Sequence, residues 1–201
     1  MSINYIFKIV VGGDTNAGKT SFCECIQGNA FRTKNSPTIG VEFFSNVLTI
    51  DGKHIKNQIW DVSGDDKFRS ILTPYFKGTC GVMLFFDVSD IDSFHHLSDW
   101  TNKFIKENVD IPIIIVGNKT DKKRVISKSY AEGFARENNY LYSEMSVKDY
   151  SNVRETYKYF IRKIYERVND IKGVRTIVPD KMEYGDEEEY TRLTCGKCIV
   201  S

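Results

Sequence analysis

The chain has 201 residues, of which 41% are hydrophobic and 27% charged, and its formal net charge is +1 at pH 7. This composition fits one soluble domain with a tail, and the near-neutral charge argues against nucleic-acid binding. We expect no signal peptide, and no apolar run approaches the roughly 18 residues that a membrane-spanning helix needs. The five cysteines are an odd number without a persuasive disulfide framework, which favours a reducing, cytosolic compartment.

Strands and helices are predicted to alternate along the chain. Apolar runs predict strands over residues 5–11, 40–50, 54–61, 80–88, 111–117 and 140–145. Helices are predicted over residues 22–27, 90–107, 127–138 and 152–168, with irregular connections over 31–39 and 62–73. This alternation predicts a three-layer α/β fold, with a six-stranded, mostly parallel sheet, one antiparallel edge strand and about five helices.

Apolar spacing predicts which helix faces are buried. In the helix over 90–107 the predicted core positions are Phe94, Leu97, Phe104 and Ile105. In the helix over 152–168 they are Val153, Tyr157, Phe160, Ile161 and Ile164. Glycine and proline interrupt any periodicity after this helix, so we expect a folded domain over residues 1–170 and a flexible tail over 171–201.

The segment from Gly13 to Thr20 reads Gly-Asp-Thr-Asn-Ala-Gly-Lys-Thr and matches G-x-x-x-x-G-K-[ST]. Such a turn between a strand and a helix points backbone N–H groups into one concavity that favours phosphate. Lys19 would place a cation on the outer phosphates, and the Thr20 hydroxyl would ligate Mg²⁺. An accidental Lys-Thr after an ordinary turn is the alternative, which the strand-to-helix context disfavours. The predicted nucleotide-contacting residues here are Thr15, Asn16, Ala17, Gly18, Lys19, Thr20 and Ser21.

Four further segments follow predicted strand ends: Ser36–Phe43, Trp60–Gly64, Gly117–Asp121 and Glu144–Lys148. Together with the phosphate loop, they resemble the ordered motifs of Ras-superfamily small GTPases over roughly residues 5–168. Within that superfamily, the chain resembles Rab proteins in the sequence of residues 39–43, in Trp60 and in the segment 75–78. The resemblance implies a P-loop GTPase domain.

By this resemblance, Asp121 would accept two hydrogen bonds from guanine, Asn118 would tether the loops, and the Lys119 stem would lie over the base. Adenine lacks the 2-amino group, so Asp121 disfavours the alternative of an ATP-using kinase. The family form has Ala where this chain has Val147, a small departure if only the main chain is used. Further contacts to the base, by main chain or by ring, would come from Ser146, Val147, Lys148 and Phe31.

The resemblance also implies a metal site and a switch. Thr38 would bind Mg²⁺ only in the presence of a γ-phosphate, Asp61 would hold it through water, and Gly64 would donate its N–H to that phosphate. Without Thr20 nearby, a capping Thr and a strand-end Asp would be the simpler interpretation. Residues 34–45 and 62–78 would be ordered by GTP and bind effectors, and an exchange factor and a GTPase-activating protein would drive the cycle.

One position departs from the family pattern, because Asp65 stands where relatives carry the Gln that orients water. Asp is shorter, has no donor when ionised and brings negative charge toward the triphosphate, so we predict slow hydrolysis. A protonated Asp65 or a partner-supplied Gln would restore the rate. The first hypothesis is a Rab-like GTPase switch in vesicle traffic, with Lys19, Thr38, Gly64 and Asp65 as its catalytic residues. The second is a pseudo-GTPase that binds effectors without turnover.

The last four residues, Cys198-Ile199-Val200-Ser201, fit the C-a-a-X prenylation pattern, although Rab proteins more often end in paired cysteines. One lipid binds membrane only marginally, which makes Cys195 the candidate second anchor. A frayed terminus, or a C-x-x-C redox or metal pair, is the alternative. The expected location is cytoplasmic and peripheral on a membrane, with a prenyl-chaperoning protein as partner. The sequence leaves the type and number of lipids open.

Overall fold

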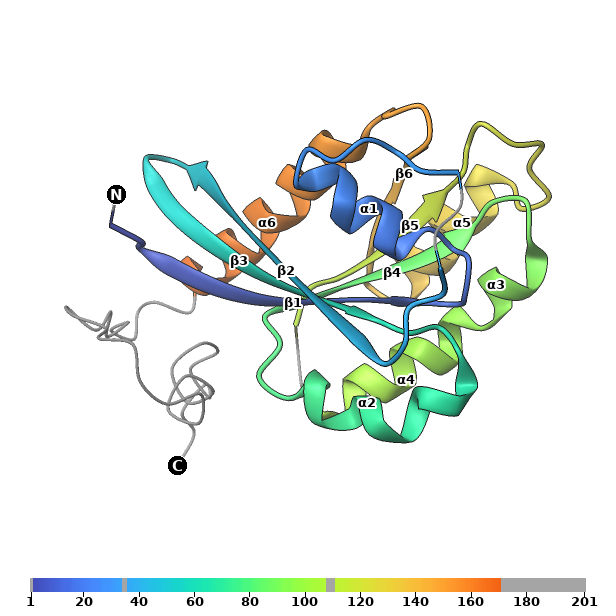
Figure 1. Cartoon of the computed structure of the whole chain (residues 1–201), viewed down its shortest axis with the longest axis horizontal. Helices are drawn as coiled ribbons and strands as arrows, with labels where there is room; N and C mark the ends of the chain where they lie inside the picture. The colour runs from blue at the N-terminus through green and yellow to red at the C-terminus, as the bar shows by residue number, and fades with distance from the viewer. Residues whose placement is uncertain (1, 34–35, 108–110, 171–201) are drawn as a thin grey trace.

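The computed structural model describes residues 2–33, 36–107 and 111–170, with a twisted sheet at the centre (Figure 1). The strands lie in the order β2-β3-β1-β4-β5-β6, with β2 antiparallel to β3 and the other neighbours parallel. Their bounds are β1 Tyr5–Gly13, β2 Val41–Ile50, β3 Lys53–Val62, β4 Gly81–Asp87, β5 Ile113–Asn118 and β6 Leu141–Glu144. This sheet confirms the predicted fold class. The predicted tail, residues 171–201, lies outside the described residues.

Helices cover both faces of the sheet and complete three layers (Figure 1). They are α1 Lys19–Ile26, η1 Asp66–Phe68 (a 3-10 helix), α2 Arg69–Phe76, α3 Ile91–His95, α4 Leu97–Glu107, α5 Lys128–Glu137 and α6 Val153–Asp170. One buried cluster lies between the sheet and α1 with α6, and a second lies between the sheet and α2 to α5. Among the described residues, no helix has the length and apolar content needed to cross a membrane.

The two central strands explain why the core is continuous. Every residue of β4 and β5 is buried, as expected for parallel strands covered on both faces. In β1 the side chains alternate, so that Ile9 and Val11 join the cluster under α1 and α6 while Val10 joins the other. The stripe predicted for α6 is confirmed, because all five of its residues are buried.

Two predictions on the α2–α4 face are wrong. Ile105 is 47% exposed, and Trp100 is fully buried in its place. Adjacent helical residues point about 100° apart, and in α4 the buried side is that of Phe104 and of Trp100 one turn earlier, which leaves Ile105 turned toward solvent. The segment 62–73, predicted to be irregular, contains η1 and the start of α2, which Leu72 and Phe76 anchor in the core. Pro74 and the neighbouring charges obscured this short helix in the sequence.

Candidate nucleotide-binding site

The phosphate-loop motif connects the end of β1 to the start of α1. Gly13, Asn16 and Gly18 have positive φ angles of 124°, 64° and 93°, and such left-handed residues turn successive N–H groups toward one concavity. No side chain caps the N-terminus of α1, so the partial positive charge of the helix faces the loop. A Cβ on Gly18 would overlap Nδ2 of Asn118, so this close approach requires glycine. The loop therefore has the backbone of an anion site.

Lys19 lies inside this loop. It is only 5% exposed, and its Nζ donates to the carbonyl oxygens of Gly13 and Asp14, each at 2.8 Å. Burial lowers the pKa of Lys19, while the charges of Asp61 and Asp14 oppose the shift. The ammonium group is thus held against the backbone of the loop where phosphate is predicted to bind. Among the other predicted phosphate contacts, Ala17 is buried, Thr15 and Asn16 are exposed, and Ser21 lies in the first turn of α1.

The three predicted metal residues come together although they are far apart in the sequence. Thr20 Oγ1 lies 2.8 Å from Thr38 Oγ1 and donates to Asp61 Oδ2 at 2.5 Å, and Thr38 donates to the same oxygen at 3.4 Å. Burial raises the pKa of Asp61 to about 6, against the opposing effect of Lys19 and of the two threonine hydroxyls. Asp61 Oδ1 is buried with no hydrogen-bond partner in the described part of the chain.

This cluster fits Mg²⁺, which prefers oxygen ligands and keeps several waters or phosphate oxygens in its shell. The unpartnered oxygen of Asp61 is available to a water of that shell. A bound ion would neutralise negative charge on the outer phosphates. The described residues contain no group of three His, Cys, Asp or Glu side chains with metal-binding geometry. The proposed Mg²⁺ site does not need such a group, because its protein ligands are two hydroxyls and one carboxylate.

Asn118, at the end of β5, connects the phosphate loop to the loop after β6. Its Nδ2 donates to the Ala17 carbonyl oxygen at 2.8 Å, and its Oδ1 accepts the N–H of Val147 at 3.3 Å. Asn118 is 2% exposed, so neither bond is replaced by water. The predicted tether is therefore in a position to align the phosphate site with the base site.

Asp121, the predicted hydrogen-bond acceptor for the base, lies beside Ser146 and Lys148 of the loop after β6. Ser146 Oγ donates to its Oδ1 at 2.7 Å, and the Lys148 ammonium lies 3.4 Å from its Oδ2. Desolvation alone would raise the pKa of Asp121, but these two partners hold it below its usual value. The carboxylate is thus ionised at neutral pH and accepts only. The neighbouring Lys119 points its ammonium to Asp87 Oδ2 at 2.9 Å.

Gly64 and Asp65 follow β3, opposite the phosphate loop. A Cβ on Gly64 would overlap the backbone of Asp14 and Thr15, so only glycine permits this contact. Asp65 Oδ1 accepts the N–H of Lys67 at 2.9 Å, while the Asp65 N–H donates to Ser63 Oγ at 3.2 Å. The Asp65 carboxylate therefore caps the turn that opens η1. This structural role was not predicted from the sequence.

The sequence analysis also missed an anchor of the phosphate loop. Asp14 Oδ1 accepts the Trp100 Nε1–H at 3.0 Å, and Asp14 Oδ2 lies 2.5 Å from His96 Nδ1. These contacts attach the loop to the start of α4 and to the break before it. Asp14 occupies a position that the motif leaves free, so only the buried Trp100, with its obligatory N–H donor, could have indicated the contact.

A phosphate loop after β1, an oxygen cluster for Mg²⁺ and a carboxylate placed for guanine define the class as a P-loop guanine-nucleotide-binding protein. A comparison with protein-family models agrees, since the Ras family model matches residues 8–166. The chain therefore belongs to the Ras family, which confirms the predicted Ras-superfamily membership. Proteins of this family in general bind GTP and GDP with Mg²⁺, hydrolyse GTP and act as switches with regulators and effectors.

Proposed function

We propose that this chain is a Rab-like GTPase switch in vesicle traffic, that it hydrolyses GTP slowly, and that it recruits effectors to a membrane surface. The contact between Thr20, Thr38 and Asp61 carries the proposal. Thr38 belongs to a segment without regular structure, whereas Thr20 belongs to the phosphate loop. A metal ion that bound both hydroxyls and a γ-phosphate would hold that segment in place, and loss of the phosphate would release it.

An aromatic cluster supports an effector surface next to this segment. Trp60 of β3 contacts Phe43 of β2 and Tyr75 of α2, with ring centroids 5.1 Å and 5.4 Å apart. Phe43 is 52% exposed, and Ile39 nearby is 78% exposed. The cluster joins the two predicted effector segments, residues 34–45 and 62–78, of which 34–35 lie outside the described residues. Exposed aromatic rings are typical anchors of protein interfaces, so a partner could sense both segments at once.

Asp65 keeps a second function open, that of a pseudo-GTPase which binds effectors with nucleotide bound but without turnover. Its carboxylate caps η1 through the N–H of Lys67. A side chain engaged in that bond is not available to orient water, and its charge opposes a triphosphate. The two proposed functions differ in turnover. A slow GTPase switch has a measurable intrinsic rate of GTP hydrolysis, whereas a pseudo-GTPase has none.

Identification of the bound nucleotide, followed by single-turnover hydrolysis of GTP, tests both functions. We expect purified protein to carry mostly GDP, and Asp65→Gln to hydrolyse GTP about tenfold faster, because a positioned amide replaces a repelling charge. Asp65→Asn is the matched control, since it removes the charge while keeping the length, and we expect a smaller increase. Equal rates for Asp65→Gln and the natural protein would refute the role of Asp65. Persistent GTP in the natural protein would favour the pseudo-GTPase.

Membrane attachment is proposed through lipid on Cys198, with Cys195 as a second anchor, and both lie outside the described residues. The segment 170–201 holds five Lys or Arg against seven Asp or Glu, a net charge of −2, so it supplies no polybasic second signal. We therefore expect two lipids, and with them a prenyl-chaperoning partner. Intact-mass analysis of protein from its native host should show the added mass. An unmodified Cys198 would contradict the proposed anchor.

A further inference from the structure

Tyr150 lies in the loop between β6 and α6, two residues after the predicted base contact Lys148. The loop is closed on itself, since Ser146 and Ser151 exchange two backbone hydrogen bonds at 3.1 Å and 2.9 Å, and the Tyr150 N–H donates to the Val147 carbonyl oxygen at 3.3 Å. These bonds fix Tyr150 relative to the residues that are predicted to contact guanine.

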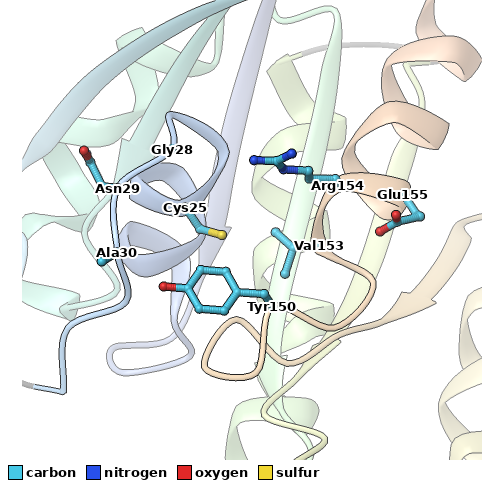
Figure 2. A pocket seen from close by; sticks show the side chains of 8 residues that line it. All are labelled: Cys25, Gly28, Asn29, Ala30, Tyr150, Val153, Arg154 and Glu155. Carbon is cyan, nitrogen blue, oxygen red and sulfur yellow. The ribbon is translucent and has the colours of Figure 1, made fainter.

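The Tyr150 side chain reaches across to a segment 119 residues earlier in the chain. Its hydroxyl oxygen accepts the backbone N–H of Phe31 at 2.6 Å. Figure 2 shows the Tyr150 ring extended toward the segment that contains Asn29 and Ala30 and continues to Phe31. Two residues earlier, the Asn29 N–H still donates to the Glu24 carbonyl oxygen of α1 at 3.1 Å, so the tyrosine bond restrains the chain shortly after it leaves the helix.

Core packing does not explain the position of this ring. Tyr150 is 52% exposed and has a φ of 56°, a left-handed conformation that is uncommon for a bulky residue. The ring borders a cavity of roughly 330 Å³, which Cys25, Ala30 and Arg154 also line (Figure 2). Backbone strain of this kind persists only where other contacts hold it. With this left-handed backbone, the Tyr150 side chain is directed so that its hydroxyl oxygen accepts the Phe31 N–H.

We propose that Tyr150 is a positioning residue for the guanine site, which slows nucleotide release by holding Phe31 in place. The inference rests on the proposed function, since it needs guanine bound in contact with both Phe31 and the loop 146–148, as two walls of its site. Tyr150 joins these two walls of the site with one hydrogen bond. A base that leaves by separation of the walls must first break that bond. When a base enters the open site, the bond between the Tyr150 hydroxyl and the Phe31 N–H forms only after the base has made contact. The hydroxyl therefore changes the dissociation rate and leaves the association rate unchanged.

The test is the release of a fluorescent GDP analogue, chased with unlabelled GDP in Mg²⁺, from the full chain. Binding by the natural protein comes first, because a failure there overturns the proposed function itself. For Tyr150→Phe we expect roughly fivefold faster dissociation, as the loss of one neutral hydrogen bond implies, with an unchanged association rate. Tyr130→Phe on α5 is the matched control, since it removes the hydroxyl of another exposed tyrosine away from the site.

A double-mutant cycle shows whether the effect passes through Phe31. In a Phe31→Ala protein the restrained ring is gone, so we expect Tyr150→Phe to add less than twofold to the dissociation rate. Full additivity would overturn the role through Phe31. The proposal would also be overturned if Tyr150→Phe had an unchanged melting temperature and released the GDP analogue at a rate within twofold of that of the natural protein. If Tyr150→Phe is unstable, Tyr150→Leu serves as the second variant under the same criteria.

Discussion

Replacing Asp121 with Asn should change the base preference of the site from guanine to xanthine. In the proposed site the carboxylate would accept hydrogen bonds from N1–H and the 2-amino group of guanine, whereas an amide would place its own NH₂ against one of these donors. Xanthine carries a carbonyl oxygen in place of the amino group and can accept from that NH₂. We expect the affinity for GDP to fall about 10³-fold, because mispaired buried polar groups discriminate strongly.

Calorimetry in Mg²⁺ with GDP, xanthosine diphosphate and ADP measures this change directly. Asp121→Asn should bind xanthosine diphosphate more tightly than GDP, and the natural protein should do the reverse. Asp51→Asn is the control, because Asp51 pairs with Arg162 on the surface at the β2–β3 turn and its loss leaves base recognition intact. Equal binding of ADP and GDP by the natural protein would contradict the guanine assignment as a whole.

The sequence predicted which distant residues lie close together where a motif fixes both residue and geometry. Thr20 and Asp61 are 41 residues apart, and Thr38 lies between them in the sequence. Each of the three lies next to a strand or loop that the sequence indicates. Because parallel strands bring their carboxyl ends to one edge of the sheet, the motifs at those ends had to meet. The meeting of the Asn118–Asp121 segment with the phosphate loop was predictable for the same reason, since Asn118 is the last residue of the wholly buried strand β5.

Contacts between motifs and ordinary positions could not be predicted. Asp14 is separated from Trp100 by 86 residues, and Phe31 from Tyr150 by 119. No local pattern indicates which of many polar side chains will meet across such distances, since the answer depends on packing of whole layers. The capping role of Asp65 is different, because its partner is the N–H of Lys67, two residues on. An Asp followed two residues later by its N–H partner is the local pattern of an Asx turn, so this contact lies within reach of the sequence alone.

Asn118→Ala should cause the largest loss of stability among the site variants. The substitution removes the donor to the Ala17 carbonyl and the acceptor for the Val147 N–H, and Asn118 is too deeply buried for water to replace them. Each unsatisfied buried group costs about 1–3 kcal/mol, so for the two groups we expect the free energy of unfolding to fall by about 2–6 kcal/mol. Urea denaturation at several GDP concentrations, extrapolated to zero GDP, measures the change, because bound nucleotide itself adds stability and the variant binds it less tightly.

Asn138→Ala is the matched control for this prediction. Asn138 Nδ2 also donates to a backbone carbonyl, that of Phe134 at 2.8 Å, but it lies exposed at the end of α5, where water can take over the bond. We therefore expect a loss of at most about 1 kcal/mol and unchanged GDP affinity. Asn118→Ala should lower GDP affinity as well, because its two bonds align the phosphate loop with the base loop. Similar losses of stability in the two variants would show that Asn118 does not act as this tether.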